Sequence, residues 1–239
     1  MFNPQLSSFN FHQSPIVYKK SEVILPSQFE QLIFKDECEA PASNYLYWNG
    51  SEFSIGDRQN LVIDFKHYSD SFCGKVEDDL LIRSLGKVSP ENYKIVDGTC
   101  GLARDTLKFL WAGYRVDAYE ESPELAVLLH QAYDKNPYKK LNFFFKSFEK
   151  ADFDFYNSNS ILYLDPMYGD SLKKAKALPS KEMQFLRELL PQKEFKVSPF
   201  LKATFDRVVV KRNLKAKKLD MSPTYSLKGK NVRFDVFKL

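Results

Sequence analysis

Two short apolar segments of this chain each end abruptly in an acidic residue that is followed by turn-forming residues. The first runs from Ile95 to Asp97 and continues into Gly98, and the second runs from Ile161 to Leu164 and continues into Asp165 and Pro166. Short apolar runs bounded by turn signals are typical of buried strands. Ligands of open parallel sheets bind beyond the carboxyl ends of the strands. We therefore expect Asp97 and Asp165 to stand at that edge of one sheet.

Strands and helices alternate regularly from residue 91 onward. The apolar patterns predict strands over 93–96, 114–119, 141–145, 160–164 and 207–211, and helices over 103–111, 123–132 and 180–190. Two further strands, over 224–227 and 232–237, flank a turn and predict a hairpin. Such alternation is typical of a doubly wound parallel sheet with helices on its faces. The predicted fold is therefore α/β, with a mostly parallel, seven-stranded Rossmann-like sheet that ends in a C-terminal antiparallel hairpin.

The N-terminal part of the chain lacks this regular pattern. Asn49-Gly50 stands between β-forming residues and favours a hairpin over 45–55. The run 61–65 predicts another strand, and the spacing over 76–85 predicts a helix that Gly86 ends. We therefore predict a small α/β appendage over residues 1–90, a candidate for substrate recognition, and a core domain over residues 91–239.

Charge is distributed unevenly along the chain. Residues 1–170 carry a net charge of −8, whereas residues 171–239 carry +12. The basic residues of the second part form clusters, chiefly Lys173, Lys174, Lys176 and Lys181, and then Lys211, Arg212, Lys215, Lys217 and Lys218. Such clusters suit a polyanion, because neutralising phosphates releases counterions. We expect a nucleic-acid partner, with solvated surface lysines as the alternative.

Cysteine usage and hydropathy bear on the cellular compartment. The three cysteines Cys38, Cys73 and Cys100 are far apart and odd in number, which favours neither a disulfide framework nor a zinc site. No apolar run reaches the roughly 18 residues of a membrane span, and the first twenty residues lack the apolar core of a signal peptide. We therefore expect a cytoplasmic protein that binds neither a metal nor a membrane.

The turn after the first apolar run has the features of a ligand-binding loop. Gly98 and Gly101 allow the backbone to turn tightly and to approach a ligand closely. Glu120 ends the next predicted strand, where a carboxylate can accept hydrogen bonds from ribose hydroxyls. The dinucleotide and P-loop glycine motifs are absent. The segment resembles the first motif of S-adenosylmethionine (SAM)-dependent methyltransferases, which implies that Asp97, Gly98, Gly101 and Glu120 bind SAM; a helix cap and a surface acid are the alternatives for the two acids taken singly.

The turn after the second apolar run carries a second motif. Asp165-Pro166-Met167-Tyr168 resembles the [DNS]-P-P-[FYW] tetrapeptide of enzymes that methylate exocyclic amines of bases. Such an amine is a poor nucleophile, and acceptors for its N–H groups localise its lone pair toward the methyl group. Proline stiffens the turn, and an aromatic ring can stack on the base. We therefore predict Asp165, Pro166 and Tyr168 as catalytic residues, with a plain loop as the alternative.

Six blocks that occur in order narrow the resemblance to one family. They are 97–105, 119–123, 163–168, 181–183, 207–212 and 232–236. This ordered set is similar to the ribosomal RNA small subunit methyltransferase J family over about residues 61–239. The resemblance implies methyl transfer from SAM to the exocyclic N2 of a guanosine in 16S rRNA, and donor contacts at Arg104, Asp105, Glu120, Glu121, Ser147 and Asp165. Two alternatives stay open, namely an adenine-N6 methyltransferase and a non-catalytic RNA-binding protein of the same fold.

Overall fold

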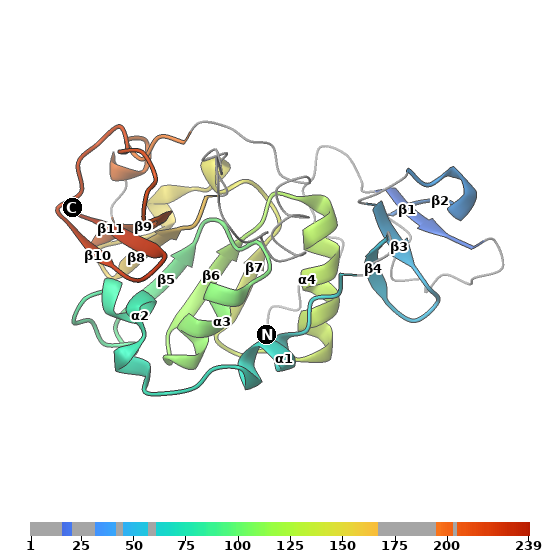
Figure 1. Ribbon diagram of the computed structural model, residues 1–239, viewed down its shortest axis with the longest axis horizontal. Coiled ribbons are helices and arrows are strands. Elements are labelled where there is room, and N and C mark those ends of the chain that lie inside the picture. Colours follow the sequence, from blue (N-terminus) through green and yellow to red (C-terminus); the bar gives the residue numbers. More distant parts are fainter. Residues whose placement is uncertain (1–15, 21–31, 42–44, 57–60, 167–194, 203–204) are drawn as a thin grey trace.

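The computed structural model describes residues 16–20, 32–41, 45–56, 61–166, 195–202 and 205–239, and these form two sheets (Figure 1). The larger sheet has seven strands in the order β10-β11-β9-β8-β5-β6-β7. The strands from β5 to β9 run parallel to one another, and β11 runs antiparallel to both of its neighbours. The bounds are β5 (Lys94–Asp97), β6 (Arg115–Tyr119), β7 (Leu141–Phe144), β8 (Ser160–Leu164), β9 (Arg207–Asn213), β10 (Tyr225–Lys228) and β11 (Val232–Lys238). The predicted sheet, with its C-terminal hairpin, is confirmed.

The centre of the larger sheet is covered on both faces. All five residues of β8 are buried, and so are Ile95, Val96 and Asp97 of β5. Continuous apolar runs, without alternation, are the expected sequence of parallel strands that pack on both sides. The central strands therefore form a rigid support for the turns that follow them.

Helix α4 (Pro123–Lys135) follows β6, and α3 (Arg104–Trp111) follows β5. The Ser122 hydroxyl caps α4 by accepting a hydrogen bond from the Leu125 backbone N–H at 3.3 Å, and Pro123 occupies the first helical turn. Both features are common at helix N-termini, because they suit backbone groups that have no partner within the helix. The helix predicted over 180–190 lies outside the described residues.

A smaller sheet precedes the larger one and has the order β2-β1-β3-β4. Its strands are β1 (Ile16–Lys19), β2 (Ile33–Asp36), β3 (Tyr45–Trp48) and β4 (Phe53–Gly56). The predicted hairpin is confirmed as β3 and β4, with Gly50 at a φ of 101°. The side-chain amide of Gln131 in α4 accepts from the Phe53 N–H at 2.6 Å and donates to the Phe53 carbonyl at 3.0 Å. This pair of hydrogen bonds ties the smaller sheet to the helix layer of the larger one.

Two predictions for the segment that connects the two sheets are wrong, and in each case an aspartate that caps a helix explains the difference. Leu61 forms only an isolated bridge with Ile55, and Asp64 then caps helix α1 (Phe65–Asp70) by accepting from the His67 N–H at 3.0 Å. The predicted helix over 76–85 is divided into a 3-10 turn, η4 (Val76–Asp78), and α2 (Leu80–Ser84). Asp79 lies between them in an extended conformation and caps α2. Aspartates at such positions start a helix, since their side chains replace missing backbone acceptors.

Helices α1 and α2 both contact α3, and α2 also contacts β11. The domain boundary at residue 90 stays a prediction, while these contacts join residues 65–84 to the larger sheet. The remaining described elements are short 3-10 turns: η3 (Glu37–Glu39), η5 (Phe148–Lys150), η6 (Phe153–Phe155) and η7 (Phe200–Lys202). None of the helices in the described ranges has the length and apolar character needed to cross a bilayer.

Candidate active site

The predicted acidic residues meet at the edge where the parallel strands end. Asp97 is the last residue of β5, Glu120 follows β6, and Asp165 follows β8. Because β5 pairs with both β6 and β8, Asp97 lies between the other two strand ends. The Asp165 backbone N–H donates to the Thr99 hydroxyl oxygen at 2.6 Å, which joins the two turns directly. The expectation that Asp97 and Asp165 stand at the same edge of one sheet is confirmed, and the two strands that they follow or end are adjacent.

Asp97 is almost completely buried and organises the turn that follows it. Its carboxylate accepts from the Thr99 N–H at 3.1 Å and from the Thr106 hydroxyl of α3 at 2.6 Å. Burial raises the pKa of Asp97 to about 7, although these two hydrogen bonds oppose the shift. Asp97 therefore links the end of β5 to the first turns of α3.

Glycine is required at positions 98 and 101 of the turn for two different structural reasons. A Cβ on Gly98 would lie 2.7 Å from Leu164 Cδ2 and 2.8 Å from Phe148 Cδ1, so close packing requires glycine there. Gly101 has a φ of 56°, and among the described residues a Cβ there would meet only the Thr99 carbonyl oxygen, at 3.9 Å. The backbone beside Gly101 is therefore open and can receive a ligand at close approach.

Glu120 supports this open turn from the neighbouring strand. Its two carboxylate oxygens accept from the backbone N–H groups of Gly101 and Ser122, each at 2.8 Å. Only 5% of the residue is exposed, and this burial raises the pKa of Glu120 to about 7 despite both hydrogen bonds. A carboxylate oxygen has a second lone pair, so each oxygen can also accept from a hydroxyl group. The open turn and this carboxylate can together receive a ligand that carries hydroxyl groups.

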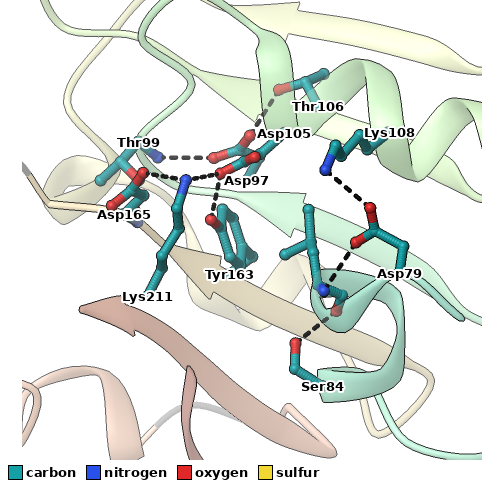
Figure 2. Close-up of polar contacts among 11 residues, drawn as sticks. Asp79, Ser84, Asp97, Thr99, Asp105, Thr106, Lys108, Tyr163, Asp165 and Lys211 are labelled. Atoms are coloured by element: carbon teal, nitrogen blue, oxygen red, sulfur yellow. Dashed lines mark hydrogen bonds and ion pairs between the residues drawn. The ribbon is translucent and has the colours of Figure 1, made fainter. Parts of the chain in front are cut away.

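A cluster of charged residues joins the two turns to β9 (Figure 2). Lys211 Nζ lies 2.6 Å from Asp105 Oδ2 and 2.8 Å from Asp165 Oδ2. The Tyr163 hydroxyl donates to the same Asp105 oxygen at 2.5 Å. The side chains of Asp105, Lys211 and Asp165 are 19%, 25% and 32% exposed, so the cluster borders solvent at the strand ends.

The charges within this cluster shift one another's ionisation. Desolvation is the largest effect on Asp105, but Lys211 and Tyr163 outweigh it and hold the pKa of Asp105 below its usual value. Desolvation also dominates at Asp165, where Lys211 opposes it and the charge of Asp105 adds to it, so that the pKa of Asp165 is raised. Desolvation alone would lower the pKa of Lys211, yet the two carboxylates raise it above its usual value. Lys211 is therefore a permanent cation in this site.

Several predicted contacts lie around this centre. Ser147 is half-buried and immediately precedes η5, and Glu121 is exposed. Arg104 is exposed and places its guanidinium carbon 4.6 Å from the centre of the Tyr68 ring of α1. Pro166 is half-buried beside Asp165, whereas Tyr168 lies outside the described residues.

The structure corrects part of the predicted phosphate-binding set. Lys211 is engaged by two carboxylates, and Arg212 is only 7% exposed and donates to the Lys217 carbonyl at 3.2 Å. Both residues lie on β9, which pairs with a strand on either side. A cluster of basic residues in the sequence does not show that some of its members belong to a paired strand. Lys215, Lys217 and Lys218 are exposed, as expected of a phosphate-binding surface. The lysines at 173, 174, 176 and 181 fall outside the described residues.

Three further residues of the site are not among the site residues predicted from the sequence. Thr99, Thr106 and Tyr163 position Asp165, Asp97 and Asp105 through their hydroxyl groups. Cys100 is buried, which raises the pKa of its thiol well above the usual value, so it is not poised as a nucleophile. Among the described residues, no group of three or more histidine, cysteine or acidic side chains could hold a metal ion.

Comparison with known proteins identifies sequence relatives of this chain. A model of the SAM-dependent methyltransferase family matches residues 52–239. Ribosomal RNA small subunit methyltransferase J of Alcanivorax borkumensis is 32% identical over 171 residues, which are 68% of either chain. The protein of the same name from Buchnera aphidicola subsp. Schizaphis graminum is 32% identical over 222 residues, which are 82% of this chain and 86% of that one.

A solved structure supports the fold independently. The SAM-dependent methyltransferase of Neisseria gonorrhoeae superposes with a TM-score of 0.68, at 23% identity, over 93% of this chain and 95% of that chain. At this identity the likeness shows the fold alone. Together with the matches in sequence, it confirms the predicted Rossmann-like methyltransferase architecture. The chain belongs to the ribosomal RNA small subunit methyltransferase J family and is a SAM-dependent methyltransferase.

Proposed function

We propose that this enzyme transfers a methyl group from SAM to the exocyclic N2 of a guanosine in 16S rRNA of the small ribosomal subunit. The names of its relatives support the rRNA substrate, and the family resemblance supports the guanine N2 position. The observation that carries the proposal is the 2.6 Å hydrogen bond from the Asp165 N–H to Thr99. It brings the acceptor motif against the donor-binding turn, which direct transfer between two bound molecules requires. The cytoplasm is the compartment that this substrate implies.

Donor binding is assigned to the strand ends on the β6 side. Glu120 accepts the ribose hydroxyls, and the open backbone at Gly101 lies against the donor. SAM supplies a methyl group on a positively charged sulfur. The full proposed donor-binding set is Asp97, Gly98, Gly101, Arg104, Asp105, Glu120, Glu121, Ser147 and Asp165.

Acceptor binding is assigned to the turn after β8. The lone pair of a guanine amine is delocalised into the ring, so the amine attacks poorly by itself. The Asp165 carboxylate and a backbone carbonyl of the turn accept the N–H bonds, which directs the lone pair toward the methyl group. Pro166 stiffens the turn, and Tyr168 stacks on the base. The Asp165 carboxylate can also take the proton that the amine loses.

RNA binding is assigned to exposed basic residues near β9. Lys215, Lys217 and Lys218 follow this strand and face solvent. We add Lys173, Lys174 and Lys176 on the basis of charge alone. The target base must leave its stack to reach Asp165, so the substrate nucleotide is unpaired in a loop or flipped out.

The test uses small ribosomal subunits that lack methylation. The enzyme is incubated with these subunits and isotopically labelled SAM, and the digested RNA is examined by nucleoside mass spectrometry. We expect labelled N2-methylguanosine from the wild-type enzyme and none from Asp165→Asn. Asp70→Asn, a change at an exposed aspartate that pairs with Lys66, is the matched control and should retain activity.

Other products would contradict the proposal in recognisable ways. Labelled N6-methyladenosine would establish the adenine alternative. No product from an enzyme that still binds SAM would favour the non-catalytic alternative, and thermal stabilisation by SAM reports that binding.

A further inference from the structure

We propose that Lys211 is a positioning residue, anchored by Asp105, that holds the Asp165 carboxylate in the orientation and charge state needed to receive the acceptor amine. The ammonium group thereby couples the donor half of the site to the acceptor half. The catalytic part of this inference rests on the proposed function, whereas the electrostatic part does not.

The first argument is the pairing of the two strands that carry these residues. Val210 of β9 stands opposite Leu164 of β8, so the next residues along, Lys211 and Asp165, face each other at the strand ends. β8 is buried throughout, and β11 closes β9 on its other side over seven residue pairs. The sheet therefore fixes the backbone of Lys211, and only the orientation of its side chain needs a further contact.

The second argument is the way in which Asp105 holds the ammonium. Asp105 Oδ2 receives both Lys211 Nζ at 2.6 Å and the Tyr163 hydroxyl at 2.5 Å (Figure 2). Tyr163 comes from the fully buried part of β8, and Asp105 from the first turn of α3. Asp105 is thus held on one side by a rigid donor and directs Lys211 on the other. Family resemblance implies an SAM contact for Asp105, but its contacts give it a second task as the anchor of Lys211.

The third argument is the charge balance at the strand ends. Among the described residues, the titratable groups that interact with Asp165 are Asp97 of β5, Asp105 of α3, Tyr163 of β8 and Lys211 of β9. Lys108 of α3 also acts on Asp105, but it is paired with Asp79 at 2.8 Å. Within this described set, Lys211 alone places a cation against both Asp105 and Asp165. Its removal would leave Asp165 beside two carboxylates, which favours the protonated form.

A titration that needs no substrate tests the electrostatic part. The side-chain carboxyl groups of aspartate are labelled with ¹³C, and the Asp165 signal is identified by its loss in Asp165→Asn. We expect the midpoint of Asp165 to rise by about one pH unit or more in Lys211→Met, since loss of a contacting cation typically shifts a carboxyl by that order. Lys211→Gln, which keeps the length and N–H donors without the charge, serves if Lys211→Met does not fold. An unchanged midpoint in the folded variant overturns the inference.

Turnover against pH tests the catalytic part. A higher titration midpoint of Asp165 leaves less carboxylate at a given pH. The acidic limb of the pH profile of kcat therefore moves to higher pH in Lys211→Met. On the acidic limb, at pH values below the midpoints of both enzymes, we expect kcat to fall about tenfold for each unit of that shift, with the Kd of SAM changed by less than about threefold. Lys211→Arg keeps the charge and should restore part of kcat and the wild-type limb. A loss that is equal at all pH values would mean that Lys211 is merely structural.

A matched control separates this effect from general damage. Lys94 begins β5 at the opposite end of the sheet and pairs with the buried Asp117 at 2.9 Å. Lys94→Met removes a similar, partly exposed ion pair and should lower stability without moving the acidic limb. If wild-type enzyme forms no N2-methylguanosine, the proposed function fails, and the carboxyl titration still decides whether Lys211 controls Asp165.

Discussion

The backbone N–H of Asp165 donates a 2.6 Å hydrogen bond to the hydroxyl oxygen of Thr99, and this bond joins two turns whose residues lie 66 positions apart in the sequence. Thr99 belongs to the turn after β5, and Asp165 begins the acceptor motif after β8. This contact sets the distance between the proposed donor-binding and acceptor-binding parts of the site. A mutation at Thr99 can therefore alter the acceptor geometry without touching a charged residue.

Thr99→Val should lower kcat by about tenfold, because valine keeps the shape of threonine but leaves the Asp165 N–H without its acceptor, a loss worth about 1–3 kcal/mol. Steady-state kinetics and a separate measurement of SAM binding check this. Thr99→Ser retains the hydroxyl group and should keep most of the activity. A serine variant as impaired as the valine variant would contradict the role given to this hydrogen bond.

Sequence alone predicted the strands that bury most completely. The strand expected over 160–164 has the same bounds as β8. An uninterrupted apolar run of this length is typical of a strand that is buried on both faces of a parallel sheet. The predictions for 61–65 and 76–85 were wrong. Both segments have the apolar spacing on which the predictions were based, but Asp64 and Asp79 cap helices that start at other residues. A cap is a contact between one side chain and one backbone group, so it can override a weak apolar pattern.

The same contrast divides the candidate site. The meeting of Asp97 and Asp165 was predictable, because a general rule places strand ends at one edge of a parallel sheet. The contacts of Lys211 were not, since they depend on the register between β8 and β9. In the sequence, Lys211 stands beside Arg212 and reads as one more member of a basic cluster. Only the pairing of the strands turns it toward two carboxylates instead of toward solvent.

Glu120→Gln should weaken SAM binding at neutral pH, because an amide offers one acceptor oxygen where the carboxylate offers two. The pKa of Glu120 in the free protein is about 7, so wild-type affinity should also fall as the pH drops below 7 and the carboxyl becomes protonated. Calorimetric Kd values at pH 6 and pH 8 check both points. Glu77→Gln, a change at an exposed glutamate outside the proposed donor-binding set, is the control and should leave both Kd values unchanged. A pH dependence that persists unchanged in Glu120→Gln would exclude Glu120 as its source.

The two buried carboxyls also predict how stability depends on pH. Asp97 and Glu120 have pKa values of about 7 in the folded protein, against 3.8 and 4.5 as ordinary values. Between these limits the folded state binds more protons than the unfolded state, so these groups make the free energy of unfolding fall as the pH rises toward 7. Denaturant unfolding of the SAM-free protein at several pH values measures the slope. Glu120→Gln should make the slope less negative, and an identical slope would show that Glu120 is not protonated in the fold.

Gly98→Ala should destabilise the protein by about 1–3 kcal/mol, as an added methyl group does in a closely packed core. Its Cβ would lie within 3.0 Å of Leu164 and Phe148, which come from β8 and from η5 after β7. Thermal unfolding measures the loss, and SAM should restore less stability to this variant because the displaced turn is part of the proposed donor site. Gly74→Ala is a useful comparison, since a Cβ there meets no atom of the described residues within 4 Å, and the φ of 85° is the feature that opposes the substitution.

The link between the two sheets is the subject of a last prediction. Gln131→Leu removes both hydrogen bonds to the Phe53 backbone, and each is worth about 0.5–1.5 kcal/mol. We expect faster hydrogen exchange at the Phe53 amide and along β3 and β4, with little change in β5 and β8, because the hairpin opens locally before the larger sheet does. Lys135→Met removes the neighbouring exposed ion pair with Glu52 and should have a smaller effect. If Gln131→Leu left the exchange of β4 unchanged, the smaller sheet would be held to α4 by apolar packing and not by this side chain.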